Sequence, residues 1–180
     1  GGAGGTITLG TVTAGSLTFS NFTGTYALSD GGLTLNSGLT LQSGAAAVTI
    51  SSPIILGGGQ SWLNNSASLL TISGGVDNGA NLLTLGGTGN TTISSVIGSG
   101  AGGLTMTGTG TLTLNGSAVN TFTGGLNLNG GTLLPDFANL ATPTDLINNG
   151  NALGLGGGIL NIKGNSSGTT SQTLGNVTVN

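Results

Sequence analysis

The chain has almost no ionisable side chains. It contains no cysteine, histidine, glutamate or arginine, and its net charge of −3 comes from one lysine and four aspartates. The absence of cysteine excludes disulfides and thiolate metal sites, and the absence of histidine as well excludes Ser/His/Asp and Cys/His nucleophile arrangements within the chain. Phosphate binding needs clustered Lys and Arg, so nucleic acid is not an expected partner.

Aromatic residues and long apolar runs are also scarce. Only 3% of the residues are aromatic against 36% hydrophobic overall, so a core must be thin and filled by Leu, Ile and Val. No apolar run approaches the roughly 18 residues of a membrane-spanning helix. The chain opens on Gly1-Gly2-Ala3 without a basic n-region, so we expect a processed product or a fragment.

What the sequence does contain is glycine, at 39 of 180 residues, and short alternating segments. Within 98–134, the segments 104–106, 112–114 and 126–128 alternate an apolar with a small polar residue, which is the period of a half-buried strand. Glycines separate the segments and favour tight corners. The same pattern recurs at 6–9, 16–19, 33–35, 39–41, 48–50, 69–72, 82–85, 159–162 and 177–179.

This spacing predicts an all-β fold in the form of a β-solenoid. The connections are too short for βαβ crossovers, and no segment shows a helical stripe. Each coil would bury its apolar side against its neighbours, and coils of about 20 to 25 residues give roughly eight of them. Thr, Ser and Asn would stack as ladders between coils. Both ends resemble ordinary strands, so either the native chain continues or copies stack end to end.

Residues 135–150 break the pattern, with two of the three prolines and two of the four aspartates. The segment 142–145 resembles a helix start and Asn149-Gly150 a helix stop. We therefore predict a projecting loop at 135–150 with at most one or two helical turns. Residues 1–180 as a whole are predicted to be a single β-solenoid segment of a longer repeat protein.

A family resemblance rests on the order of fixed residues in 98–134, about a fifth of the chain. It is carried by Gly103, Leu104, Gly108, Gly110, Leu112, Leu114, Thr121, Phe122, Gly124, Gly125, Gly131 and Leu133. This stretch resembles the autotransporter-associated β-strand repeat, also called the passenger-associated transport repeat. The family usually has Lys, Tyr and Thr where this chain has Met106, Phe122 and Leu126. The resemblance implies a right-handed parallel β-helix on a secreted or surface-displayed bacterial protein, helping the passenger cross the outer membrane, with no catalytic residues.

Catalytic and ligand-binding candidates are few. Glycosidases need close carboxylates, whereas Asp30, Asp77, Asp136 and Asp145 are dispersed in the sequence. Asp136 with Asp145 could bind calcium, although turn and helix-start roles are the simpler interpretation. Lys163 is interpreted as a solvated turn residue in preference to a lyase base. We predict a protein that is not an enzyme and has no cofactor or metal.

Three further features have simple structural interpretations. Trp62, the single tryptophan, is expected to cover a corner or an end of the solenoid and not to form a ligand platform. The runs 57–59 and 156–158 are not phosphate loops, because no GK[ST] follows them. Chance in an Asn-, Ser- and Thr-rich chain explains the glycosylation sequons at Asn21, Asn64, Asn90, Asn115, Asn165 and Asn176.

Three functions stay open. The first is an extracellular structural or adhesive element, such as a surface stalk, filament or matrix component, that associates end to end or with further copies of the repeat and contacts glycans or other cells. The second is an ice-binding solenoid, suggested by Thr105, Thr107, Thr109, Thr111 and Thr113, although irregular coil lengths count against the flat array it needs. The third is a carbohydrate-active enzyme or a non-catalytic carbohydrate-binding passenger segment.

Overall fold

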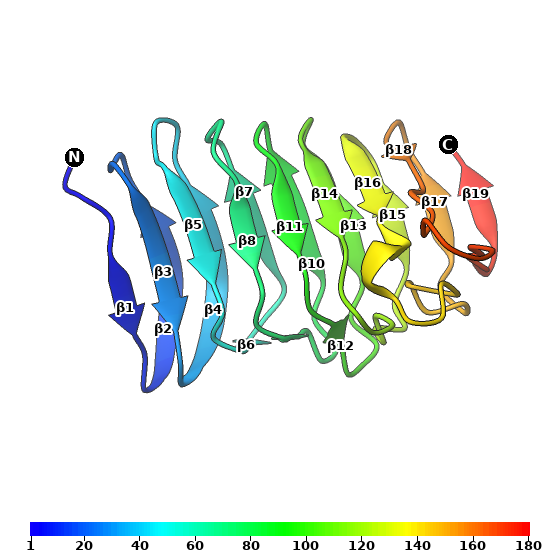
Figure 1. Ribbon diagram of the computed structural model, residues 1–180, viewed down its shortest axis with the longest axis horizontal. Coiled ribbons are helices and arrows are strands. Elements are labelled where there is room, and N and C mark those ends of the chain that lie inside the picture. The colour runs from blue at the N-terminus through cyan, green and yellow to red at the C-terminus, as the bar shows by residue number, and fades with distance from the viewer.

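The chain is a β-solenoid of about eight turns, as a computed structural model of residues 1–180 shows (Figure 1). This confirms the predicted fold class and the predicted number of coils. All inter-strand pairing is parallel, in an eight-stranded and an eleven-stranded sheet. The strands are β1 (Thr6–Thr8), β2 (Thr11–Phe19), β3 (Thr25–Ser29), β4 (Gly32–Leu41), β5 (Ala47–Ile50), β6 (Ile54–Leu56), β7 (Gln60–Asn64), β8 (Leu70–Ile72), β9 (Val76–Asp77), β10 (Leu83–Gly87), β11 (Thr91–Ile93), β12 (Ile97–Gly98), β13 (Leu104–Met106), β14 (Thr111–Leu114), β15 (Leu126–Leu128), β16 (Thr132–Pro135), β17 (Leu153–Leu155), β18 (Ile159–Leu160) and β19 (Val177–Val179).

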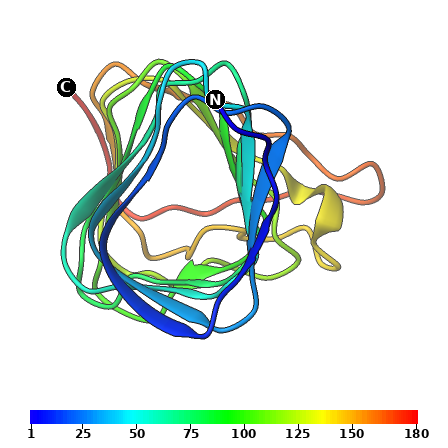
Figure 2. The same cartoon turned by 90° about the vertical axis from the view of Figure 1, so that its left-hand side faces the viewer.

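Each coil has three sides, and the coils enclose one interior when viewed along the axis (Figure 2). The β8 face is the eight-stranded sheet β1-β3-β5-β8-β11-β14-β16-β18. The β6 face consists of β6, β9, β12 and the first halves of β2 and β4. The β10 face consists of β7, β10, β13, β15, β17, β19 and the second halves of β2 and β4. The long strand β4 turns the corner between these two faces, and the glycine run 57–59 makes the same corner one coil later.

The interior is a continuous aliphatic core. On the β8 face, Leu28 pairs with Ile50, Ile50 with Ile72, and Ile72 with Ile93, so each apolar side chain stacks on the same position of the next coil. All four are buried. Burying one such side chain contributes about 1.5–3 kcal/mol. Repetition of this stacking through 32 buried apolar residues holds the coils together without disulfides.

Polar side chains add hydrogen bonds between coils. The hydroxyl of Ser66 donates to the carbonyl of Ala45, 21 residues away, and the Asn64 amide donates to the carbonyl of Asn90, 26 residues away. The hydroxyl of Ser95 donates to the carbonyl of Gly74. These side chains join neighbouring coils as predicted, but they bond to the backbone of the next coil and not to one another as in a side-chain ladder.

Two side-chain amides stand in for strand backbone on the β6 face, where the later coils have no regular strand. The Asn120 side chain accepts from the Ile97 amide at 2.8 Å and donates to the Leu146 carbonyl at 2.9 Å. One coil further, Gln172 accepts from the Ile147 amide at 3.0 Å and donates to its carbonyl at 2.7 Å. These amides continue the ladder across coils that have lost their third strand.

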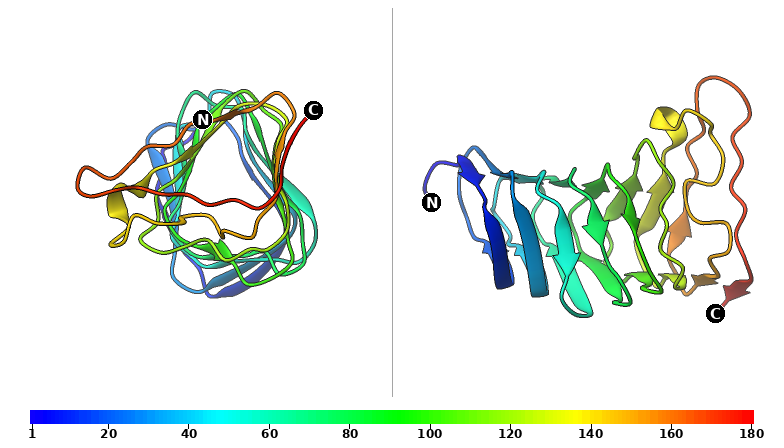
Figure 3. Two further views of the ribbon diagram at one scale, coloured as in Figure 1. Left: turned by 90° about the vertical axis from the view of Figure 1, so that its right-hand side faces the viewer. Right: turned by 90° about the horizontal axis from the view of Figure 1, so that it is seen from below.

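The helix start predicted at 142–145 is wrong, although 135–150 contains no more than the one or two helical turns expected. The only helical element is a 3₁₀ turn at Phe137–Asn139, whose first residues are capped by the Asp136 carboxylate accepting from Ala138 N. Asp145 has a φ of 51°, which no helix accommodates, and Leu146 and Ile147 are fully buried in the stack. The 3₁₀ turn and the segment between β18 and β19 project from the side of the rod (Figure 3). The structure contains no helix with the length and apolar character needed to cross a lipid bilayer.

Candidate functional site

The apolar residues of the repeat motif all lie in the core. Leu104, Leu112, Leu114, Phe122 and Leu133 are each at most 1% exposed. Leu104 stacks between Leu83 and Leu126 of the adjacent coils. None of these side chains reaches solvent, so the motif builds the interior of the rod and offers no binding surface through them.

The glycines of the motif allow adjacent coils to approach each other at corners. A Cβ on Gly108, Gly110 or Gly124 would overlap or crowd backbone atoms of the preceding coil, and Gly131 has a φ of 66°. A Cβ on Gly103 would lie 2.9 Å from the Gly125 carbonyl oxygen. A Cβ on Gly125 would not be crowded, since the nearest atom to it would be in the Asn127 side chain, 3.7 Å away. Thr121 continues the stacking by donating its amide to the Ile97 carbonyl at 2.9 Å.

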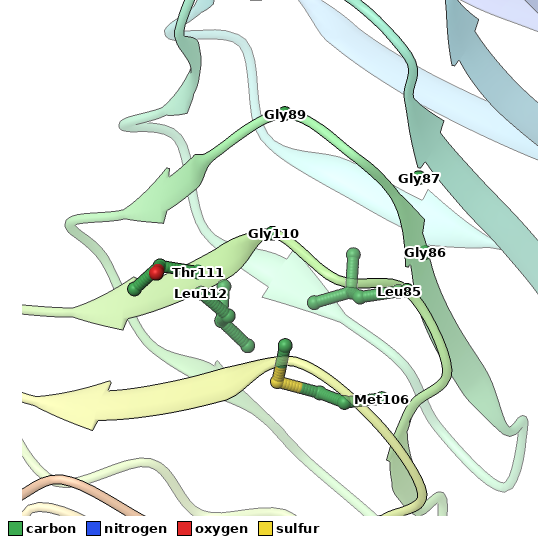
Figure 4. A pocket seen from close by; sticks show the side chains of 9 residues that line it. Leu85, Gly86, Gly87, Gly89, Met106, Gly110, Thr111 and Leu112 are labelled. Carbon is green, nitrogen blue, oxygen red and sulfur yellow. The ribbon is translucent and has the colours of Figure 1, made fainter. Parts of the chain in front are cut away.

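A small hollow lies at the corner formed by these glycines (Figure 4). Leu85, Met106 and Leu112 point towards it, and its volume of about 10 Å³ has room for one water molecule at most. It is too small for an organic ligand. Met106 is only 4% exposed. The residue that stands where the repeat family usually has lysine is therefore part of the packed interior.

Trp62 does not lie at a corner or an end. It lies on β7 with its side chain 1% exposed, inside the core, and its indole N–H donates to the Gln60 side chain at 3.1 Å. Gln60 in turn donates to the Leu35 carbonyl at 2.6 Å. The expectation that Trp62 covers a corner or an end is wrong, because a coil on each side encloses it. Its burial also rules out a role as an exposed ligand platform.

The charged side chains form one ion pair and no metal cluster. Lys163 Nζ lies 2.8 Å from Asp136 Oδ2, with the lysine side chain largely exposed. Asp145 accepts from the Thr173 amide at 2.6 Å and from the Asn149 amide group at 3.4 Å. No group of three or more His, Cys, Asp or Glu residues could hold a metal ion. Asp136 and Asp145 thus have local partners from the coil that follows them.

The sequons differ in accessibility. Asn64 is fully buried and donates to the carbonyls of Ser68 and Asn90, so it cannot carry a glycan in the folded chain. The exposed sequon residues are Asn21, Asn90 and Asn176, and the half-buried ones are Asn115 and Asn165.

The largest hollow is the open interior of the first coil. It has a volume of about 440 Å³, and its apolar lining consists of Ile7, Leu17, Phe19, Phe22, Tyr26 and Leu28. Phe22 packs edge-on against Tyr26 with ring centroids 4.7 Å apart. No residue before Phe22 is buried. Ile7, Leu17 and Phe19 occupy core positions that no further coil covers, whereas Leu28 stacks under Ile7 and is buried.

The last coil is open in the same way. Val177 and Val179 on β19 stack on Leu153 and Leu155, which places them in core positions, yet they are 56% and 77% exposed. Leu160 on β18, which stacks on the buried Leu133, is only half-buried. At each end the last strands have one edge with unpaired N–H and C=O groups, which can pair with another parallel strand.

A shallow groove on the β6 face is the remaining hollow. Its volume is about 280 Å³, and it is lined by Pro53, Ile55, Val96 and the polar residues Asp77, Ser99 and Thr121. The Ser99 hydroxyl donates to the Asp77 carboxylate. The groove has no aromatic side chain on which a sugar ring could stack.

Comparison with known proteins finds no similarity that could identify the chain. No family model matches it, and neither a curated protein nor a solved structure is detectably similar to it. The geometry alone therefore carries the functional argument, and it offers extended surfaces in place of a reactive pocket: two open end coils and three long side faces.

Proposed function

We propose that the chain is an extracellular structural and adhesive β-solenoid of a bacterium, forming part of a surface stalk, filament or matrix, whose end coils pair with further coils of the same kind. One observation carries the proposal. Both ends of the rod present uncovered core positions together with free parallel strand edges. Another solenoid coil would cover the exposed core positions and pair with the free strand edges at the same time.

Charge supports this pairing. A net charge of −3 over 180 residues gives little repulsion between copies, and the end strands carry no lysine or other charged side chain that would discourage edge pairing. Hydrophobic burial and backbone hydrogen bonds can then act together. The proposal includes no catalytic activity, because the chain lacks His, Cys, Glu and Arg and its four aspartates are dispersed.

Surface display follows from the resemblance of 98–134 to a repeat found in secreted passengers. As an adhesive element, the rod would contact glycans or other cells through its side faces. Antibodies raised against the chain should label intact cells of the source bacterium without permeabilisation. Labelling only after permeabilisation would contradict the extracellular assignment.

End-to-end pairing can be tested with one variant for each end. Ile7→Lys places a charge in the open first coil, and Val179→Lys places one in the open last coil. We expect the unmodified chain to form rods of several copies by sedimentation and negative-stain microscopy, and each variant alone to stay monomeric. A mixture of the two variants should stop at dimers, because one intact end remains on each.

The matched control is Thr34→Lys, which adds the same charge at an outward position of β4. It should assemble like the unmodified chain. Monomers of the unmodified chain at all concentrations, or equal disruption by Thr34→Lys, would overturn the proposal.

A further inference from the structure

One outward column of the β8 face consists of threonine in four successive coils. Thr49 pairs with Thr71, Thr71 with Thr92, and Thr92 with Thr113. Successive members are 21 or 22 residues apart, so the coils are regular over this stretch. We call Thr49, Thr71, Thr92 and Thr113 the threonine column. Their strands lie side by side as a row (Figure 1).

A second column of hydroxyl groups runs beside it. Ser51, Ser73 and Ser94 each donate a backbone amide to the carbonyl of the same core position one coil earlier, namely Leu28, Ile50 and Ile72, at 2.8–2.9 Å. They are therefore in register with each other and lie two residues beyond the threonine column. The two columns place hydroxyl groups about 4.8 Å apart along the axis and roughly 6.7 Å apart along the strands.

The array is stiff and uncharged. Threonine is β-branched and has restricted χ1 freedom, so a column of threonines can hold one side-chain orientation at little entropic cost. The one charged residue within these coils, Asp77, lies on the β6 face, and the next ones are Asp30 before the first coil concerned and Asp136 after the last. None of the three hollows of the molecule includes a member of the threonine column.

The other two faces lack such an array. The equivalent outward column on the β10 face runs Ser61, Thr84, Thr105, Asn127 and Gly154. On the β6 face it runs Thr34, Ile55, Asp77 and Gly98. The candidate threonines of the sequence are divided accordingly: Thr105 belongs to the β10 face and only Thr113 to the threonine column. The column ends after Thr113, whose partner in the next coil is Leu134, and the first longer coil follows, in which Thr132 pairs with Ile159.

The shape and chemistry of this face limit the kinds of ligand that it can bind. Small soluble ligands bind in concave sites, nucleic acid needs basic side chains, and protein interfaces favour aromatic and arginine anchors. None of these features is present on this stretch of the face. Evenly spaced hydroxyl groups can instead hold an ordered layer of water through hydrogen bonds. We infer that the threonine column and the adjoining serines form an ice-binding face, whose ligand is the surface of an ice crystal.

The test measures ice-crystal shaping, thermal hysteresis and inhibition of ice recrystallisation with the unmodified chain. Thr71→Tyr with Thr92→Tyr places two bulky rings in the middle of the array, on outward positions of strands that accept tyrosine well. We expect the unmodified chain to shape ice and inhibit recrystallisation, and the double variant to lose both effects. Thr84→Tyr with Ser61→Tyr is the matched control on the β10 face and should retain both.

Far-ultraviolet circular dichroism and the thermal midpoint show that each variant is folded. A second variant, Thr71→Val with Thr92→Val, keeps the β-branched shape and removes only the hydroxyl groups, and it should weaken the effect. No effect of the unmodified chain on ice, or equal loss in the β10-face control, would overturn the inference. Assembly of the chain into rods should be the same in all these variants, which separates this inference from the proposed function.

Discussion

At the scale of single residues, buried amide side chains form hydrogen bonds between coils that backbone groups form elsewhere in the rod. The Asn120 side chain bridges the Ile97 amide and the Leu146 carbonyl, which are 49 positions apart in sequence and belong to different coils. Asn120 is 1% exposed. Removal of the side-chain amide would leave the Ile97 N–H in the interior without a partner, whereas the Leu146 carbonyl would keep the backbone N–H of Asn120 at 2.9 Å. An unsatisfied buried group costs about 1–3 kcal/mol.

We therefore expect Asn120→Ala to lower the free energy of unfolding by about 1–3 kcal/mol, since the buried Ile97 N–H loses its partner. Urea unfolding followed by circular dichroism measures this. Asn127→Ala is the control, because Asn127 is exposed on β15 and its loss should change stability by less than about 0.5 kcal/mol. Equal effects of the two substitutions would show that Asn120 has no special role.

Two glycines of the same repeat motif should respond in opposite ways to alanine. A Cβ on Gly110 would overlap the carbonyl of Gly89, so Gly110→Ala should destabilise the chain by about 1–3 kcal/mol, as overpacking does. Gly125→Ala meets nothing closer than 3.7 Å and has no positive φ, so it should be neutral or slightly stabilising. The thermal unfolding midpoints of both variants test this prediction. A Gly110→Ala protein as stable as the unmodified chain would show that a Cβ fits at this corner.

Side-chain placement was only partly predictable from sequence. Alternation identified inward residues such as Leu104 and Leu112 correctly, because period 2 fixes the side of a strand. It did not place Trp62 in the interior, since a single large ring gives no periodic signal. The roles of Asn120 and Gln172 could not be foreseen either, because they depend on the backbone of other coils.

At the scale of the element, the repeating unit is one whole coil. Two near-copies in the sequence, 69–74 and 82–87, are not successive repeats: β8 lies on the β8 face and β10 on the β10 face. The equivalent position in the next coil is reached 21 or 22 residues later, as from Thr71 to Thr92. Removal of one complete coil should therefore preserve the faces, whereas removal of part of a coil should not.

Deletion of 71–91 joins Leu70 to Thr92, which takes the place of Thr71 on the β8 face. We expect this protein to fold as a shorter solenoid with a smaller urea m-value, because less surface is exposed on unfolding. Deletion of 71–81 joins strands of two different faces and should give an unfolded chain. Circular dichroism and urea titration distinguish these outcomes. Two equally folded or two equally unfolded products would contradict the claim that one whole coil is the repeating unit.

Sequence patterns found most strands but not their limits. The pattern does not predict the strand β3 (Thr25–Ser29), because Ala27 puts an apolar residue where the alternation needs a polar one. Pro135 was assigned to a loop, yet it ends β16 and its carbonyl accepts from the Lys163 amide at 2.9 Å. No helix starts at 142–145, because the burial of Leu146 and Ile147 outweighs the local capping signals.

At the scale of the whole molecule, the protection of backbone amides from hydrogen exchange should vary along the rod. Residues 1–21 and 154–180 include no buried residue, while the coils between them contain the whole buried core. In solenoids, each coil is stabilised by its neighbours, so end coils open first. Hydrogen exchange should be fast in both end segments of the monomer and slow between 28 and 133.

Assembly should change this pattern. When copies pair end to end, the first and last coils each gain a neighbour, and their exchange should slow while the centre stays unchanged. Ile7→Lys should remove the slowing at the first coil at protein concentrations where the unmodified chain assembles. Uniform exchange along the monomer, or no change on assembly, would contradict this.

The orientation of the strands also has a mechanical consequence. The strands run across the rod and their backbone hydrogen bonds run along it, so a force that pulls the two chain ends apart along the axis would detach the end coils first, because each has a neighbour on one side only. Coils would then peel away singly, each releasing about 70 Å of extended polypeptide. A tether built this way yields gradually under tension and re-forms by rewinding, where a helical bundle under the same load would give way all at once.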